Sequence, residues 1–451
     1  MTASTNSVAF GVRSRAVRGV ALAATMATIV LGAEADASAK LLALRFGRLV
    51  DGSGRVIPSP LVVVEDNRIK SVGGAAAQPP PGATVLDLRP YTALPGLIDV
   101  HTHMTYLFDD QSSLKPVDQL LKRLPAVNVF LSQHNARRTL EVGVTTVRDL
   151  GSFEAMDLAL RDLIGRGAIV GPRMFVAGVP LFISDEPVKP GQPPPAGTAD
   201  GPAEVMRVAR QQIVAGADVI KMMASTGGYD DVSGLQTFSF EELKAGVEVA
   251  HRAGKRIAVH SYGAAGARDA VRAGADSIEH AVDLDDATLA EMARRRIYYV
   301  PTIDHNRYYA ENAKTFGFSS EAIDGLRGFV PRNLETARRA FRMGVPIAMG
   351  SDAVFTMFGE NTYELGWFVK LGMTPAQALA TATTNAAALL GMEKSLGTVA
   401  PGYLADIVAV EGDPLQDISV AIRKVRWVMK DGQVVVDRTP RAAPANSPTA
   451  H

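Results

Sequence analysis

The feature that most constrains the fold is an alternation of short apolar runs with longer segments of helical periodicity. Eight such runs follow one another, and segments such as 241–253 and 285–295 repeat apolar residues at helical spacing. Strands that alternate with helices predict a parallel sheet covered on both faces. Eight units of this kind favour an α/β fold with a closed (β/α)8 barrel, similar to a TIM barrel. The runs are residues 96–100, 144–149, 173–177, 218–223, 256–260, 276–280, 298–303 and 346–350.

Both ends of the chain beyond its first 39 residues are rich in short strands. Residues 41–47, 61–69 and 84–88 are apolar stretches separated by Gly, Pro and Asp, and 405–410 and 425–436 repeat the pattern. Asp431 and Gly432 predict a hairpin turn between two of these strands. We therefore expect a composite β-sandwich domain from residues 40–93 and 398–438, a barrel at 94–397 and a flexible tail at 439–451.

The first 39 residues have the layout of a cleaved secretory signal. Arg13, Arg15 and Arg18 precede the apolar run 19–33, and small residues at 35–39 offer cleavage sites. An uncleaved membrane anchor is the alternative, but this run is shorter than the roughly 20 residues of a spanning helix. We expect a signal peptide at 1–39, export to the periplasm or medium, and no stable membrane anchor.

Composition excludes several functions. Lys plus Arg and Asp plus Glu both total 47, so the chain has no excess of basic residues, and nucleic acid is not an expected partner. The chain contains no cysteine, which excludes disulfides, thiolate metal sites and a Cys nucleophile. Any metal must therefore be bound through nitrogen and oxygen ligands.

Potential metal ligands stand where the predicted strands end, which is where barrel enzymes carry their active sites. Alternation along a strand points the imidazoles of His101 and His103 to the same side. One such pair is more often two hydrogen-bonded core histidines, but the whole set favours a metal site. Imidazole and carboxylate ligands suit Zn²⁺, with Mn²⁺, Co²⁺ or Fe²⁺ as alternatives. The set comprises His101, His103, Lys221, His260, His280 and Asp352.

Lys221 lies inside an apolar strand, where an unpaired ammonium is costly. One interpretation is an ion pair with a buried acid, either Glu279 or Asp149. The other is reaction of the amine with CO2, which gives a carbamate whose two oxygens can bridge two metal ions. Burial lowers the pKa of an amine and makes it nucleophilic, so this reaction is chemically reasonable.

An ordered set of short motifs runs through the chain: LPGLIDVHTH at 94–103, VIKMMAS at 219–225, VHSYG at 259–263, SIEH at 277–280 and GSD at 350–352. This set resembles the amidohydrolase superfamily. The resemblance is closest to the metal-dependent branch of imidazolonepropionase-related amidohydrolases and Xaa-Pro or Xaa-Lys/Arg dipeptidases, and it covers essentially the whole mature chain.

The resemblance implies a role for each ligand position. His101 and His103 would bind the more buried ion, carboxylated Lys221 would bridge both ions, and His260 and His280 would bind the second. Asp352 would contact the first ion and handle the proton, although it could also be only a ligand. Relatives are often oligomeric, so the resemblance further implies a homo-oligomer.

Three further residues are candidates for substrate contact. Tyr262 lies two residues beyond His260 on the same strand face, and its phenol could donate to the carbonyl oxygen of the scissile amide. A core tyrosine with a satisfied hydroxyl is the alternative. His305 and Arg307 follow the seventh strand, and Arg307 could bind a substrate carboxylate.

One segment departs from the pattern of the dipeptidase-like relatives. Many of them carry Gly-Gly-His after the third strand, whereas residues 182–187 here read FISDEP and contain no histidine. The Pro-rich stretch 183–201, which overlaps these residues, could be a lid, a substrate-contact loop or a disordered surface insertion. This change makes the substrate less certain than the metal core, because βα loops determine specificity.

The predicted function is that of a binuclear metal-dependent amidohydrolase. It would cleave the C–N bond of a dipeptide or N-acyl amino acid by attack of a metal-bridging hydroxide, with Asp352 as proton shuttle. The same centre could instead act on a cyclic amide, lactone or phosphoester. A catalytically silent scaffold is the remaining alternative.

Overall fold

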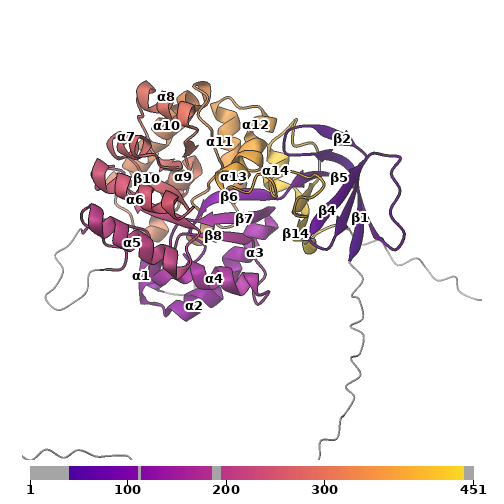
Figure 1. Cartoon of the computed structure of the whole chain (residues 1–451), viewed down its shortest axis with the longest axis horizontal. Coiled ribbons are helices and arrows are strands. Elements are labelled where there is room, and N and C mark those ends of the chain that lie inside the picture. Colours follow the sequence, from indigo (N-terminus) through magenta and orange to yellow (C-terminus); the bar gives the residue numbers. More distant parts are fainter. Residues whose placement is uncertain (1–39, 110–112, 185–194, 441–451) are drawn as a thin grey trace, which may run out of the picture. The chain divides into compact units, whose positions relative to one another are not determined.

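The apolar runs of the central region form two parallel sheets (Figure 1). The computed structural model describes residues 40–109, 113–184 and 195–440. Seven of the eight predicted runs contain a strand, and these strands are almost entirely buried. The first sheet is β6 (Leu97–Thr102), β7 (Val144–Asp149) and β8 (Arg173–Val176). The second is β9 (Val219–Met223), β10 (Arg256–Ser261), β11 (Ser277–His280) and β12 (Tyr298–Val300).

Main-chain hydrogen bonds join the two sheets at both sides. Asp218 N donates to Val176 O at 2.7 Å, which connects the start of β9 to β8. The eighth predicted run, 346–350, is not a strand, but Ile347 forms a β-bridge to β12. Between Met349 and Ala353, the backbone of this segment also donates and accepts hydrogen bonds along β6. The prediction of an α/β fold is confirmed. In the central region, the described residues form seven strands in two sheets instead of one closed sheet of eight strands.

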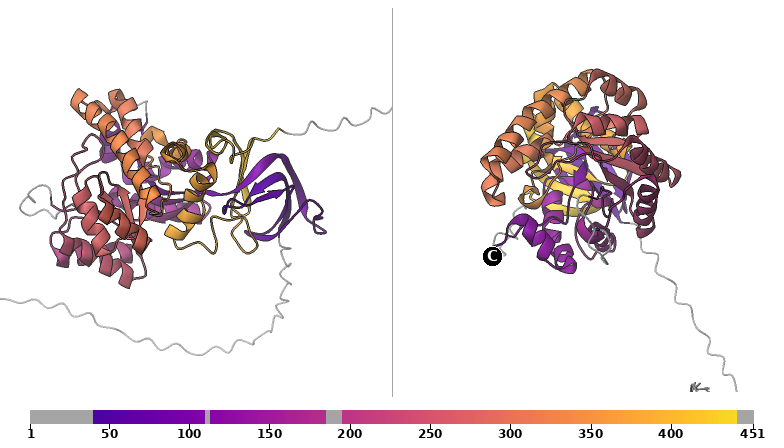
Figure 2. Two further views of the ribbon diagram at one scale, coloured as in Figure 1. Left: turned by 90° about the horizontal axis from the view of Figure 1, so that it is seen from above. Right: turned by 90° about the vertical axis from the view of Figure 1, so that its left-hand side faces the viewer.

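Helices follow the strands and cover them from outside (Figure 2). Local signals set several of their ends: Ser239 and Glu242 form a capping box, and Gly216 and Gly274 end helices in the left-handed conformation. The helices are α1 (Pro116–Lys122), α2 (Pro125–Leu131), α3 (Gln133–Glu141), α4 (Met156–Gly165), α5 (Pro202–Ala215), α6 (Phe240–Arg252), α7 (Ala264–Ala273), α8 (Asp286–Arg295), α9 (Ile303–Phe316), α10 (Ser320–Arg342), α11 (Glu364–Leu371), α12 (Pro375–Thr381), α13 (Thr384–Leu389) and α14 (Ser419–Arg423).

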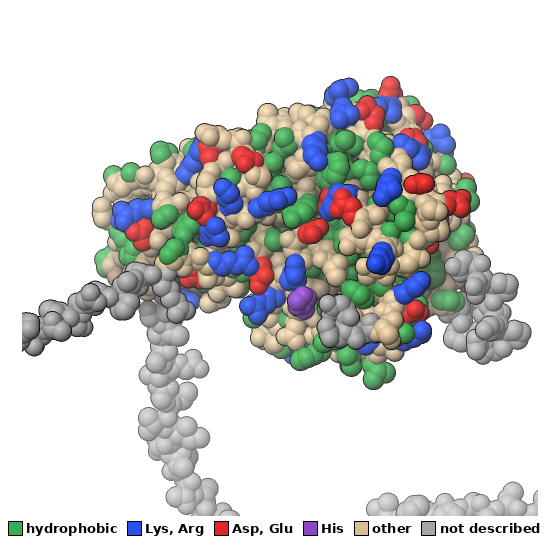
Figure 3. All heavy atoms as spheres, turned by 180° about the vertical axis from the view of Figure 1, so that it is seen from behind, with side chains coloured by type: hydrophobic (Ala, Val, Ile, Leu, Met, Phe, Trp, Pro, Cys, Tyr) green, Lys and Arg blue, Asp and Glu red, His purple; other side chains and the backbone are tan. Residues whose placement is uncertain are grey.

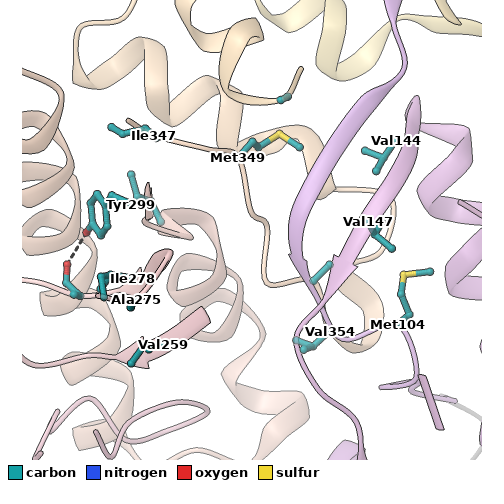
Figure 4. Close-up of a cluster of buried hydrophobic side chains, with 14 of the residues drawn as sticks. Met104, Val144, Val147, Val259, Ala275, Ile278, Tyr299, Ile347, Met349 and Val354 are labelled. Carbon is teal, nitrogen blue, oxygen red and sulfur yellow. Dashed lines mark hydrogen bonds between the residues drawn. The ribbon is translucent and has the colours of Figure 1, made fainter. Parts of the chain in front are cut away.

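The main hydrophobic core draws on both parallel sheets (Figure 4). Val144 and Val147 come from β7, Val259 from β10 and Tyr299 from β12. The Tyr299 hydroxyl donates to Ala281 O, so this buried polar atom is satisfied. The two sheets therefore share one core.

The strands from both ends of the chain pair in one eight-stranded sheet, as their shared pattern predicts. Phe46 and Trp427 lie three strands apart in this sheet, yet their ring centroids are only 6.4 Å apart. The sheet is therefore strongly curved. Two facing sheets are not distinguished in it, so the predicted sandwich stays a prediction. Its strands are β1 (Leu41–Val50), β2 (Val56–Pro58), β3 (Leu61–Glu65), β4 (Arg68–Gly73), β5 (Thr84–Pro95), β13 (Ile407–Val410), β14 (Val425–Lys430) and β15 (Gln433–Asp437).

Several predictions fall outside the described residues. These are the signal peptide at 1–39, most of the Pro-rich loop (185–194) and nearly all of the tail (441–451). None of the described helices is both long and apolar enough to cross a membrane. On the face shown in Figure 3, acidic and basic side chains are interspersed.

Candidate metal centre

The carboxyl ends of the parallel strands surround one cavity of about 370 Å³. All six predicted ligand positions contribute to its lining. Each stands at or near the end of a buried parallel strand, or on the segment that closes against β6, so their side chains reach one common space. They are His101 on β6, His103 just after it, Lys221 on β9, His260 on β10, His280 on β11 and Asp352.

Three of these side chains lie close enough together to bind one metal ion. Asp352 Oδ1 lies 3.5 Å from His101 Nε2 and 3.3 Å from His103 Nε2. One ligand atom from each residue lies within 4.8 Å of the others. A single cation can therefore contact all three.

Hydrogen bonds fix which imidazole nitrogen faces the cavity. His101 Nδ1 lies 2.8 Å from Glu279 Oε2, and His103 Nδ1 lies 2.8 Å from Gly151 O. Gly151 O can only accept, and the Glu279 carboxylate, paired with Arg148, faces His101 as an acceptor, so Nδ1 carries a proton in each ring and Nε2 faces the cavity. Such outer hydrogen bonds are the usual support of metal-binding histidines.

His260 and His280 form a second pair with ring centroids 4.7 Å apart. His260 Nε2 is buried and has no hydrogen-bond partner among the described residues. An unpaired buried polar atom is unusual, and a metal ion would satisfy it. His280 Nδ1 lies 2.6 Å from Thr302 Oγ1, a contact that leaves its Nε2 for the cavity.

The protonation states suit metal binding. Burial holds the pKa of His101 and His280 well below the ordinary value and lowers that of His260 to about 3, so these rings are neutral. Burial would raise the pKa of Asp352, but His305, His101 and His103 hold it well below its ordinary value. Burial would lower the pKa of His103, but its hydrogen bond with Asp352 raises it above the ordinary value. The neutral rings of His101, His260 and His280 and the ionised carboxylate of Asp352 are donors of the kind that a divalent metal requires.

Lys221 is also buried, and burial lowers its pKa to about 8. The two acids considered as its ion-pair partners are engaged elsewhere. Glu279 bonds Arg148 and His101, and Asp149 accepts from Thr102 and from the Met104 amide. A fraction of the Lys221 amine is therefore neutral near pH 8 and chemically able to react with CO2.

The backbone is strained at several positions at or near the cavity. His280, Thr302 and Asp352 have φ values of 71°, 50° and 53°, in the left-handed region that non-glycine residues rarely adopt. Asp352 is held there by a hydrogen bond from its amide to His101 O at 2.7 Å. Strain of this kind concentrates at functional sites, where the surroundings fix the conformation.

Comparison with known proteins identifies the family of this chain. The sequence pattern of the amidohydrolase family matches residues 92–435. The chain belongs to the amidohydrolase family. As a member, it is a hydrolase that acts on carbon–nitrogen bonds, and the predicted family resemblance is confirmed.

Individual relatives resemble this amidohydrolase over most of its length. Ochratoxinase from Aspergillus niger is 31% identical over 426 residues, which covers 88% of this chain and 87% of the relative. The crystal structure of a Xaa-Pro dipeptidase with bound methionine in its active site has a TM-score of 0.80 at 32% identity, covering 88% and 99% of the two chains. A prolidase complexed with N-methylphosphonate-L-proline has a TM-score of 0.80 at 26% identity, covering 88% and 100%.

Of the three residues predicted to contact substrate, two line the cavity and one does not. Tyr262 and His305 line the cavity, and His305 Nε2 lies 3.3 Å from Asp352 Oδ2. Arg307 does not line it, because Asp304 and Glu360 bind its guanidinium outside. Its position gives no support to the predicted contact with a substrate carboxylate.

Aromatic side chains, which the sequence analysis missed, form much of the remaining cavity wall. The Tyr106 ring stacks on His103 at 4.9 Å and on Phe153 at 5.7 Å between centroids. Tyr229 and Tyr309 make an edge-to-face pair at 5.6 Å. These residues come from separate loops and helices and follow no periodic pattern, so only their position in the fold identifies them.

Glu279 is the other missed residue, and it supports His101 from outside the cavity. It is fully buried, with Oε1 at 3.0 Å from Arg148 Nη2 and Oε2 at 2.8 Å from His101 Nδ1. From the sequence alone, Glu279 stands out only as a possible ion-pair partner for Lys221. Its place between a buried guanidinium and a ligand imidazole orients the ring.

Replacing Glu279 with glutamine should therefore affect both stability and metal binding. We expect the free energy of unfolding in urea to fall by about 3 kcal/mol, because Arg148 becomes an uncompensated buried charge. Metal affinity should fall about 10- to 100-fold, as for other partners of ligand histidines. Glu411→Gln is the control, since it removes an exposed ion pair with Arg426 and should cost less than about 1 kcal/mol. Equal effects of the two variants would contradict the role of Glu279.

Proposed function

We propose that this amidohydrolase binds two divalent ions and hydrolyses the amide bond of a dipeptide or N-acyl amino acid. Its imidazole and carboxylate ligands suit Zn²⁺ best. The observation that carries the proposal is the cluster of His101, His103 and Asp352, whose Nε2 and carboxylate atoms face a cavity beside His260 and His280. The family membership supports metal-dependent hydrolysis.

Each ion would have its own ligands. His101, His103 and Asp352 would hold the first, His260 and His280 the second, and Lys221 as a CO2-derived carbamate would contribute to both. Divalent ions at such a site lower the pKa of water and polarise a carbonyl group. The unpaired His260 Nε2 supports the second position.

Asp352 is suited to move the proton. Its carboxylate is ionised and faces the cavity, so it can accept a proton from the attacking water and return it to the leaving nitrogen. His305 Nδ1 lies 2.8 Å from the Asp352 backbone carbonyl, which helps to hold this residue in its strained conformation. Tyr262 would donate its phenolic proton to the carbonyl oxygen of the substrate.

The cavity walls favour a small substrate with an apolar group. Tyr106, Phe153 and Phe355 exclude water and can pack against an apolar side chain. Similarity to a Xaa-Pro dipeptidase, to a prolidase and to ochratoxinase supports an amide of an amino acid.

The remaining expectations belong to the same proposal. The two parallel sheets would be the halves of one (β/α)8 barrel, supported by the hydrogen bonds that join them. The signal-like pattern at 1–39 supports export. The exposed side chains of Leu124 and Phe130 offer apolar surface for a homo-oligomer.

The test is hydrolysis of a library of dipeptides and N-acyl amino acids by the mature protein loaded with Zn²⁺ and bicarbonate. We expect cleavage of a coherent subset with apolar side chains, and a kcat at least about 100-fold lower for Asp352→Asn. A protein that binds two ions per chain but cleaves no member would contradict the proposed substrate and favour cyclic amides, lactones or phosphoesters. A protein that binds no metal would contradict the mechanism.

A further inference from the structure

A buried asparagine contacts the hydroxyl of Tyr262. Asn306, on α9, places its Oδ1 3.3 Å from Tyr262 Oη. Asn306 is fully buried, Tyr262 is 2% exposed, and Tyr262 lines the cavity of the candidate metal centre. The amide nitrogen Nδ2 of Asn306 is buried and has no hydrogen-bond partner among the described residues.

The side-chain amide of Asn306 has two orientations of the same shape, which differ in where hydrogen atoms lie. With Oδ1 toward Tyr262, the phenol gives its proton to Asn306, and the two N–H groups of Nδ2 remain unpaired. With the amide rotated by half a turn, one N–H group of Nδ2 donates to Tyr262 Oη, and the oxygen and a single N–H group remain unpaired. Orphaned buried N–H groups are rarer than under-satisfied carbonyl oxygens, so the second orientation is favoured.

Asn333 shows what the first orientation requires. Its Nδ2 donates to Pro301 O at 2.7 Å, and its Oδ1 lies 3.1 Å from Tyr299 Oη. The acceptor opposite Nδ2 fixes the orientation of that amide. Asn306 has no such acceptor for Nδ2 in the described part of the chain.

The ring of Tyr262 is fixed, so the hydroxyl proton is the main variable. A Cβ atom on Gly227, which has φ +115°, would lie 1.9 Å from Tyr262 Cδ2, so only glycine permits this ring position. Phe329 packs edge-on against the same ring at 4.6 Å. The Tyr262 amide donates to Ser225 Oγ at 2.8 Å.

We propose that Asn306 is a positioning residue that donates from Nδ2 to Tyr262 Oη and thereby directs the phenolic proton to the carbonyl oxygen of the substrate. In this arrangement Tyr262 accepts one hydrogen bond from Asn306 and gives its own to the cavity. The inference rests on the proposed function for the identity of the acceptor, but the direction of the hydrogen bond is independent of it.

The substitution Asn306→Asp separates the two orientations, because a carboxylate is similar in shape and only accepts. If Asn306 donates, the aspartate captures the phenolic proton, and kcat should fall about 100-fold with little change in KM, as for loss of one oxyanion donor. If Asn306 accepts, the variant keeps that bond and has wild-type kcat, which would overturn the proposal. Asn306→Leu, which neither donates nor accepts, should lie between wild type and Asn306→Asp.

The double variant controls for indirect effects of the new charge. In a Tyr262→Phe background, Asn306→Asp and Asn306→Leu should cause no further loss of kcat, because the hydroxyl through which they act is gone. A full additional loss would mean that Asn306 acts through another group and would overturn the proposal. Metal content and the urea midpoint of each variant identify losses that come from misfolding.

Neutron diffraction on deuterium-exchanged crystals of the wild type tests the hydrogen bond without any substrate. Deuterium on the Asn306 atom nearest Tyr262 Oη would support the proposal, and its absence there would overturn it. Failure of the proposed function would appear separately, as a wild-type protein that cleaves no amide.

Discussion

Replacing Asp352 with asparagine is expected to lower kcat about 10²- to 10⁴-fold, the range that general acid–base groups contribute, while leaving metal content near normal. The amide has the shape of the carboxylate and can still contact an ion through its oxygen, but it cannot accept a proton. Metal content by elemental analysis and kcat on a cleaved amide measure the two effects.

Measuring metal content and kcat together distinguishes a proton-transfer role of Asp352 from a role as metal ligand only. A variant that loses its metal together with its activity would make Asp352 a ligand only, and a variant with wild-type kcat would remove both roles. Asp286→Asn is the matched control, because the Asp286 side chain is 76% exposed at the start of α8 and lies outside the cavity lining. It should change neither metal content nor kcat.

The parts of the fold that the sequence predicts well depend on local pattern. β7 (Val144–Asp149) coincides with its predicted run, and the turn at Asp431 and Gly432 forms with φ values of 47° and 71° at the two positions. The convergence of His101, His260 and His280 was equally predictable, because parallel strands all end at one edge of their sheet.

The parts that the sequence does not predict depend on contacts between distant segments. Run 346–350 resembles the other strands, yet it makes a single isolated bridge, and the chain turns into the left-handed region at Asp352 soon after it. Arg307 looks available for an anionic substrate until the fold places Glu360 beside it. Glu279 resembles any strand-end acid until Arg148 reaches it from a different sheet.

Lys221→Ala is expected to lose most of the metal that the wild type binds and, with it, its activity. The alanine side chain supplies no oxygen, so a ligand that contributes to both ion positions disappears. We expect metal affinity to fall by more than about 100-fold, because 100-fold is the upper end of the loss when only a hydrogen-bond partner of a ligand is replaced. Metal titration of the purified variant measures the loss.

Rescue experiments distinguish a carbamate from other roles of Lys221. Acetate or propionate can enter the space left by the side chain and offer two oxygens, so either should restore part of the metal binding and activity of Lys221→Ala. Lys221→Arg is the control, because a guanidinium keeps the positive charge, stays protonated and does not form a carbamate. Wild-type metal content in Lys221→Ala would show that the amine is no ligand. Wild-type behaviour of Lys221→Arg would instead show that Lys221 acts as a buried cation, which Glu279 and Asp352 are near enough to favour.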